Sequence, residues 1–305
     1  MLRSRISVIL PFRNAARTLR AAVESILAQT CDDLLLIAID DGSTDGSLEL
    51  MRNVSDGRLV VLSDGASRGL PARLNEAIGV ATRRHSPEFI ARMDADDIAH
   101  PERFAAQMAL MEADSTIDLV GCGIVVLEGH ERIAGCRRPP SEHETICRSP
   151  FRRFPLFHPT WFGRRAWFER HPYDELARRS QDYQLLREAY TSSRFANLPR
   201  LLLAYDETER HLRKAVSSRI TCTRNLWRRG VEPRELLPAI VGSAGMLAGS
   251  LADVAIAATG RPDLGGLRLG RLRDEEHREW RQILDGRRPA ASAATTMATT
   301  ANASL

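Results

Sequence analysis

Lysine is almost absent from this chain. Of its 305 residues, 43 are lysine or arginine, and the only lysine is Lys214. A Schiff base or a P-loop phosphate site needs lysine, whereas the fixed fork of arginine suits phosphate and carboxylate groups. The charged residues are scattered rather than gathered into one stripe, so the sequence does not indicate a nucleic-acid-binding protein.

Paired cysteines are also missing. The cysteines are odd in number and form no CxxC motif, standing at Cys31, Cys122, Cys136, Cys147 and Cys222. This pattern fits neither a disulfide framework nor a zinc site and is typical of a reducing compartment. An apolar strand is expected from residue 6, so no signal peptide is predicted. We therefore expect a cytoplasmic protein.

No apolar run reaches the roughly 20 residues that a bilayer span requires. Residues 236–252, LLPAIVGSAGMLAGSLA, carry no charge, but they are rich in small residues and are followed by Asp253. We expect a helix over 236–258 that packs within the protein or against a second copy of the chain. The alternative is shallow peripheral contact with the inner face of a membrane, aided by the arginine-rich segment RNLWRRG just before it.

Short apolar runs and amphipathic stretches alternate over the first 130 residues. We expect strands at 6–11, 34–39, 58–62, 88–93 and 117–127, and helices at about 15–29, 45–53, 70–84 and 101–113. This alternation predicts an α/β fold with a mostly parallel sheet and helices on both faces. A helical extension is expected over 212–286, and the low-complexity residues 287–305 are expected to be disordered.

Polar clusters follow three of the expected strands, at the edge where parallel sheets bind ligands. They read PFRN, DDGSTDGS and DADD. In the second, helix capping by Ser43, Thr44 or Asp45 explains the later residues but not the two aspartates, Asp40 and Asp41. A carboxylate at this edge can accept a hydrogen bond from a nucleotide base or a ribose hydroxyl. A calcium loop is excluded because its twelfth position is arginine.

The third cluster places three carboxylates within four residues, Asp94 to Asp97. Hard oxygen ligands suit Mg²⁺ or Mn²⁺, which take one or two protein carboxylates together with substrate phosphates. The spacing of Asp94 and Asp96 predicts that both side chains lie on the same side. We expect Asp97 to cap the helix that follows.

Taken together, these segments resemble glycosyltransferase family 2, a family of inverting enzymes with the GT-A fold, which is Rossmann-like. The resemblance covers about residues 5–205. The motifs that carry it, in the order of the family, are SVILPFRN, AVESILAQT, IDDGSTDGS, SRGLPARLNEAI, FIARMDADDIAHPERF, FHPTWFGRRAWF and SQDYQLLREA.

The resemblance implies roles for individual residues. Pro11 and Asp41 match positions that hold the nucleotide base, and Arg13 stands where the family commonly has a tyrosine. Its guanidinium plane can stack on a base as an aromatic ring does. Asp94 and Asp96 match the metal motif, Asp96 being the expected direct ligand and Asp94 a second ligand or a contact to the ribose. Asp182 matches the catalytic base, although Gln181 replaces the usual neighbouring glutamate.

Three further residues are candidates for contact with the donor. Arg68 and Arg73 flank GLPA and could bind the diphosphate. His158 in FHPTWF could contact the donor sugar or phosphate, or it could be a buried, hydrogen-bonded histidine. Ser180 is expected to cap the helix that contains Asp182, and an early acid there would also stabilise the helix dipole.

The resemblance implies a catalytic domain over 1–211. It implies that the domain moves a sugar with inversion from a nucleotide diphosphate donor, expected to be a UDP-sugar, onto a glycan or lipid-linked acceptor with the help of Mn²⁺ or Mg²⁺. A catalytically inactive GT-A scaffold is one alternative. A sugar-phosphate nucleotidyltransferase is another, but it needs a glycine-rich loop after the first strand, where PFRNAARTL has no glycine.

Overall fold

The computed structural model describes residues 4–177, 179–207, 212–228, 233–258 and 269–286. The predicted disordered tail, 287–305, lies outside the described residues. The contacts divide the chain into two compact units, 1–271 and 272–305. The predicted domain boundary at residue 211 stays a prediction. In the second unit, α10 (Asp274–Asp285) begins where Glu276 accepts the backbone N–H of Arg273 at 2.9 Å.

A single mixed sheet runs through the described part of the first unit, in the order β3-β2-β1-β4-β8-β6-β9-β5, with β7 paired to β6. β1 to β4 form a parallel block, in which β1 lies between β2 and β4. The strands are β1 (Ile6–Phe12), β2 (Leu34–Asp40), β3 (Leu59–Leu62), β4 (Phe89–Arg92), β5 (Ile98–Ala99), β6 (Leu119–Glu128), β7 (Arg132–Arg137), β8 (Phe162–Arg164) and β9 (Phe195–Asp206).

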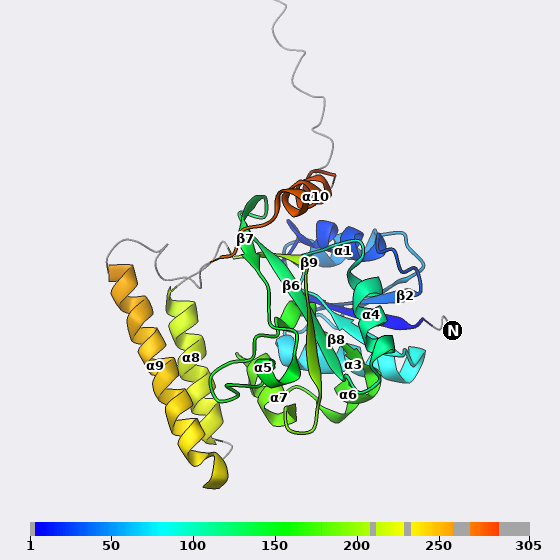
Figure 1. Ribbon diagram of the computed structural model, residues 1–305. Coiled ribbons are helices and arrows are strands. Elements are labelled where there is room, and N and C mark those ends of the chain that lie inside the picture. The colour runs from blue at the N-terminus through cyan, green and yellow to red at the C-terminus, as the bar shows by residue number, and fades with distance from the viewer. Residues whose placement is uncertain (1–3, 178, 208–211, 229–232, 259–268, 287–305) are drawn as a thin grey trace, which may run out of the picture. The chain divides into compact units, whose positions relative to one another are not determined.

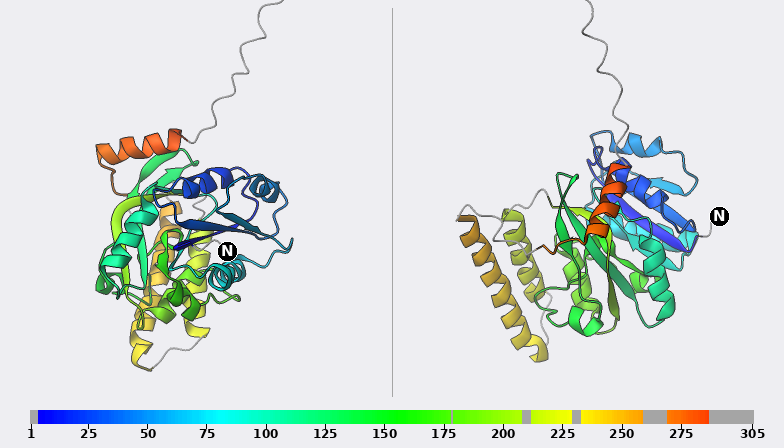
Figure 2. Two further views of the ribbon diagram at one scale, coloured as in Figure 1. Left: turned by 90° about the vertical axis from the view of Figure 1, so that its right-hand side faces the viewer. Right: turned by 45° about the horizontal axis from the view of Figure 1, so that its top comes forward.

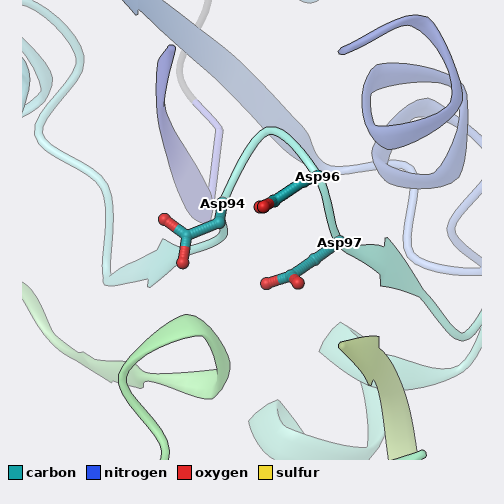
Figure 3. Close-up of side chains that lie close together, drawn as sticks. All are labelled: Asp94, Asp96 and Asp97. Carbon is teal, nitrogen blue, oxygen red and sulfur yellow. The ribbon is translucent and has the colours of Figure 1, made fainter. Parts of the chain in front are cut away.

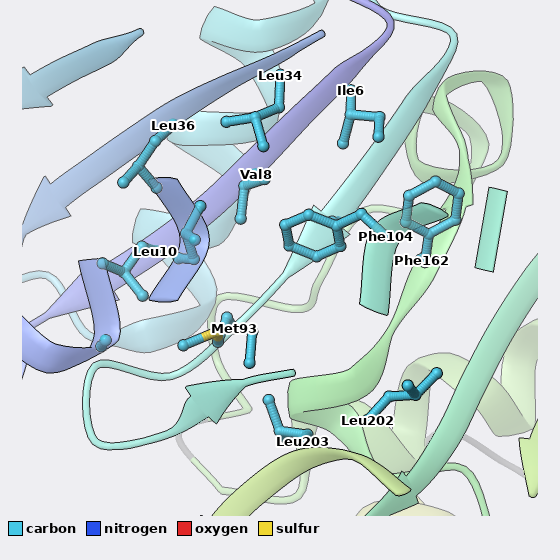
Figure 4. Packing of buried hydrophobic residues seen from close by; sticks show 14 of the residues in the cluster. Ile6, Val8, Leu10, Leu34, Leu36, Met93, Phe104, Phe162, Leu202 and Leu203 are labelled. Carbon is cyan, nitrogen blue, oxygen red and sulfur yellow. The ribbon is translucent and has the colours of Figure 1, made fainter. Parts of the chain in front are cut away.

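Helices cover both faces of the sheet, as predicted (Figure 1; Figure 2 shows α1 and α3 on opposite sides of it). Side chains alternate along a strand, so Ile6, Val8 and Leu10 face one way and Ile9 faces the other. The first face packs against α1 (Leu19–Leu27), α2 (Ser47–Arg52) and α4 (Arg103–Ala113), and part of this core is drawn in Figure 4. The second face packs against α3 (Leu70–Val80), α5 (His143–Ile146), α6 (Arg165–Arg170) and α7 (Gln181–Ala189).

The fifth predicted strand, now β6, does not pair with the parallel block. The three-residue strand β8 lies between β4 and β6 and is antiparallel to both. β6 then pairs in parallel with β9. β8 is too short to give a periodic signal in the sequence, so the insertion was not predicted.

Two long helices, α8 (Leu212–Arg228) and α9 (Leu236–Ala258), lie side by side after the sheet (Figure 1). Phe151 packs with Leu226 of α8 and Ala239 of α9. A Cβ atom on Gly242 would lie 2.5 Å from the Phe151 carbonyl oxygen, so α9 approaches this loop closely. Among the described residues, no helix combines the length and the apolar character needed to cross a membrane.

Candidate active site

The predicted site residues gather at the carboxyl ends of β1, β2 and β4. The chain order reverses at β1, because β2 lies on one side of it and β4 on the other. Ligands of open α/β sheets bind at this kind of reversal. Pro11 is buried in β1 opposite Ile39 of β2, so the first nucleotide candidate lies at this edge.

The loops after β1 and β2 are tied together. The N–H of Ala15 donates to the Ser47 hydroxyl at 2.8 Å, and the N–H of Ala16 donates to the Asp45 carboxylate at 3.0 Å. The helix that follows is α2, whose N-cap residue is Gly46 rather than one of the three predicted residues. The predicted N-cap is therefore wrong, and Asp45 and Ser47 instead hold the neighbouring loop.

Asp41 is the acceptor of a compact hydrogen-bond network. Its carboxylate accepts hydrogen bonds from the backbone N–H groups of Arg68 at 2.6 Å and Gly69 at 3.0 Å, and from the Nε of Arg73 at 3.2 Å. The Arg73 guanidinium, which is fully buried, also donates to Asp64 at 2.5 Å. Asp41 thus holds the loop after β3 against the end of β2.

The three arginines of this region differ in exposure. The Arg73 donors point to internal acceptors and the side chain presents no surface, so the predicted direct contact with a diphosphate does not fit this arrangement. Arg68 and Arg13 are more than half exposed, with side-chain exposures of 56% and 55%. Arg13 donates to Ser67 at 2.8 Å and its Nη1 lies 4.0 Å from Asp41. Both remain able to reach a ligand.

The turn between β4 and β5 brings all three acids of DADD together (Figure 3). The N–H of Asp97 donates to the carbonyl of Asp94 at 3.4 Å. One carboxylate oxygen from each of Asp94, Asp96 and Asp97 lies within 4.8 Å of the others. The prediction that Asp97 caps a helix is wrong, because α4 begins at Arg103 and its N-cap residue is Glu102.

This acid turn, residues 94–97, fits a divalent cation. Both carboxylate oxygens of Asp97 are buried and accept no hydrogen bond from the described residues. Burial, followed by the charges of Asp94 and Asp96, raises the pKa of the Asp97 carboxyl well above its usual range. Asp96 is exposed, yet desolvation and the Asp94 charge raise its pKa as well. Crowded carboxylates with unused oxygens are the ligands that hard cations require.

Arg92, the last residue of β4, lies directly beside the acid turn. Its side chain is only 3% exposed, and its guanidinium binds Asp94 through both terminal nitrogens, one at 2.8 Å. Arg103 lies behind it, donating to the carbonyls of Arg92 and Pro159 at 2.8 Å. Burial lowers the pKa of Arg103 to about 10. Neither arginine was predicted to belong to the site, although an arginine inside an apolar strand, such as Arg92, is an unusual signal.

Asp182 lies in the first turn of α7 and is half-buried. Burial raises the pKa of its carboxyl, the Arg92 charge lowers it and the Asp94 charge raises it, so the three groups lie within electrostatic reach of one another. Ser180 is the N-cap residue, but its φ of +57° is left-handed and its side chain forms no cap hydrogen bond. Ser180 thus occupies the predicted N-cap position, but without a side-chain cap hydrogen bond.

His158 occupies a buried aromatic environment. Its Nε2 lies 2.8 Å from the hydroxyl of Tyr173, and its ring packs edge-on against Trp161. Burial, assisted by the Arg92 charge, lowers the pKa of His158 well below its usual value, so the ring is neutral. The structure thus shows the buried, hydrogen-bonded histidine of the two alternatives. Contact with a donor stays a prediction.

The chain matches the family model of glycosyl transferase family 2 over residues 7–171. EpsE of Bacillus subtilis (strain 168), provisionally named a glycosyltransferase, is 34% identical over 143 residues, covering 46% of this chain and 50% of that protein. WfaP of Escherichia coli, a UDP-Glc:α-D-GlcNAc-diphosphoundecaprenol β-1,3-glucosyltransferase, is 29% identical over 109 residues, covering 36% and 42%. The matched stretch is thus about half or less of these relatives.

Solved structures share the fold at low sequence identity. The mannosyltransferase PcManGT of Pyrobaculum calidifontis, in complex with GDP-Man and Mn²⁺, gives a TM-score of 0.58 at 20% identity, covering 93% of this chain and 84% of that one. Staphylococcus aureus TarS 1–349 with UDP-GlcNAc gives 0.55 at 17% identity, covering 92% and 79%. The predicted GT-A fold is confirmed, and the chain belongs to glycosyl transferase family 2.

Proposed function

We propose that this glycosyltransferase moves one sugar, with inversion, from a UDP-sugar onto a glycan or lipid-linked acceptor. One observation carries the proposal. The three acids of the acid turn could hold a metal ion, and the half-buried carboxylate of Asp182 is close enough for the Asp94 charge to raise its pKa. The acceptor class is supported by WfaP, which acts on a diphosphoundecaprenol-linked sugar. Cytoplasmic location belongs to the same proposal.

The donor would lie along the ends of β1, β2 and β4. Pro11, Arg13 and Asp41 would border the base. Arg13 would stack on it, and the loop 66–69, which Asp41 holds in place, would lie along its side. Arg68, which is exposed beside this loop, would contact the diphosphate. The nucleotide sugars bound in the neighbouring structures, UDP-GlcNAc and GDP-Man, support a nucleotide diphosphate donor.

Asp96, Asp97 and Asp94 would hold Mn²⁺ or Mg²⁺, with Asp94 kept in place by Arg92. Such a cation, when bound, neutralises charge that develops on a departing diphosphate. Asp96 is the most open of the three to an incoming donor, because Asp97 is buried and Asp94 is already engaged. Buried Asp97 thus joins the metal set in place of its predicted capping role.

Asp182 would act as general base. The carboxylate takes the proton of the acceptor hydroxyl while that oxygen forms a bond to the anomeric carbon. The bond from that carbon to the diphosphate oxygen breaks, its electron pair leaves with the nucleoside diphosphate, and the configuration inverts. The raised pKa of Asp182 makes it a stronger base than an exposed aspartate.

Two substitutions separate the roles. Asp182→Asn should lower transfer by at least about a hundredfold, in the range expected for loss of a general base, while Mn²⁺-dependent UDP binding by calorimetry changes little. Asp96→Ala should instead lose the metal-dependent part of UDP binding. Glu49→Gln, an exposed acid on α2, is the matched control and should alter neither.

The same assays decide between the alternatives. An inactive scaffold would show no metal-dependent UDP binding, and a nucleotidyltransferase would release pyrophosphate from a nucleoside triphosphate and a sugar phosphate. Transfer that survives in Asp182→Asn would place the base elsewhere. A panel of nucleotide sugars, scored by donor hydrolysis, then identifies the donor.

A further inference from the structure

α9 buries only one side. Ala239, Ser243, Met246 and Ser250 form its buried side. The opposite side is exposed, and every described side chain on it is apolar. Its largest members are Leu237, Val241 and Leu251, exposed by 71%, 62% and 72%. Leu236, Ile240, Leu247 and Val254 are exposed as well, each by nearly half or more. A contiguous apolar face of this kind on a soluble domain indicates an interaction surface.

The apolar face continues onto α8. Ile220 and Trp227 are exposed by 52% and 41%. The Trp227 indole N–H donates to the Ser243 hydroxyl at 3.0 Å, so this ring lies at the seam between the two helices. At the same seam, a Cβ on Gly249 would lie 3.4 Å from the guanidinium carbon of Arg219. A tryptophan and an arginine therefore border the face, as at many water–lipid boundaries.

The charge of this helix pair identifies the partner. Residues 212–258 contain seven basic and three acidic residues, a net charge of +4, which equals the net charge of the whole chain, so the remainder is neutral. An apolar face on a segment with a net positive charge complements a lipid surface that carries negative headgroups. A second copy would instead bring one +4 segment against another.

We propose that the exposed face of α9, with Arg219 and Arg224 of α8, docks on an anionic membrane surface. The contact is peripheral and does not depend on the proposed sugar transfer. The length of the exposed face, from Leu236 to Val254, lets the helix lie along the interface with its apolar side chains below the headgroups.

Vesicle co-sedimentation of the full chain, without donor or acceptor, tests the proposal. The wild-type protein should bind vesicles of phosphatidylcholine with phosphatidylglycerol at least about tenfold more tightly than phosphatidylcholine alone, and high salt should weaken the binding. The double variant Leu237→Glu/Leu251→Glu should lose about tenfold or more, because two apolar side chains leave the interface. Leu176→Glu is the matched control, since Leu176 is 74% exposed and belongs to neither α8 nor α9.

A second pair of variants isolates the charge. Arg224→Gln on α8 should weaken binding to anionic vesicles by about fivefold, whereas Arg52→Gln, also exposed but on α2, should not. Circular dichroism melts establish that each variant is folded. Equal binding of both vesicle types would overturn the anionic part of the proposal. A wild-type dimer in analytical ultracentrifugation that the double variant dissociates, together with no vesicle binding, would overturn it altogether.

Discussion

At the scale of single residues, the site depends on charges that the fold keeps close together. Arg92 and Arg103 are buried beneath an acid turn whose three carboxylates would otherwise repel one another. Of the three acids, Arg92 forms hydrogen bonds only with Asp94, and the Asp97 carboxylate accepts no hydrogen bond from the described residues. The negative charge of the three carboxylates is therefore only partly balanced by the protein, and this favours a bound cation.

Asp97 gives the first residue-scale prediction. With metal removed by a chelator, Asp97→Asn should raise the free energy of unfolding by about 1–3 kcal/mol, because a buried carboxylate without donors is replaced by a neutral isostere. Added Mn²⁺ should then raise the melting temperature of the variant by less than half the shift seen in the wild type. A variant that is less stable without metal and keeps the full Mn²⁺ shift would show that Asp97 is a structural acid.

Asp182 gives a prediction about pH. A general base must be ionised, and burial raises its pKa, so the acidic limb of the transfer rate should lie above pH 4, the ordinary range of an aspartate. The transfer rate should rise with pH, whereas the free energy of unfolding should fall, because the folded state binds the Asp182 proton more tightly than the unfolded chain does. The contribution of Asp182 to stability therefore falls as pH rises through the raised pKa.

Rates and melting curves over the same pH series check both trends. Asp182→Asn should be more stable than the wild type at pH 7, and the difference should vanish below about pH 4, where both states of the wild type are protonated. An acidic limb at or below pH 4 in a protein that is still folded would argue against Asp182 as the base.

The residues of the site were predictable to different degrees. Asp41, Asp94 and Asp96 were predicted because acids that follow strands have a recognisable pattern, whereas Asp182 was predicted only from the resemblance to the family. Arg73 was predicted to contact the diphosphate, and the two alternatives for His158 stayed open, because sequence alone does not show burial. Asp97 was misassigned since the turn at 94–97 is followed by the short strand β5 rather than by a helix.

At the scale of elements, the nucleotide edge depends on two loops that touch. Gly42, in the turn after β2, has a φ of +72°, and a Cβ there would lie 3.1 Å from the backbone of Ala66 and Ser67. The same loop supplies the Arg68 and Gly69 N–H groups to Asp41. Any displacement of one loop is therefore transmitted to the other.

Gly42→Ala should lower the free energy of unfolding by about 2–3 kcal/mol and weaken UDP binding several-fold, because it adds a backbone clash to the left-handed strain. Gly46→Ala is the control. Its φ of +86° is equally unfavourable, but a Cβ there meets nothing within 4 Å, so only about 1–2 kcal/mol should be lost. Denaturant titration and calorimetry measure both. Equal effects on UDP binding would show that the loop contact is unimportant.

At the scale of the whole molecule, the α/β architecture followed from the sequence because β1 to β4 are continuous apolar runs. The mixed half of the sheet did not, since β5 and β8 are two and three residues long and their pairing partners lie far away in the chain. The long helix over 236–258 was also expected. Which of its sides would be covered could not be predicted, because nearly all of its residues are apolar or small.

The single lysine of the chain lies on α8, the basic member of the helix pair. An amine-reactive fluorophore would therefore label this one side chain and the terminal amine, with no engineering of the sequence. Changes in the emission of the dye on Lys214 upon mixing with vesicles would report on the helix pair itself.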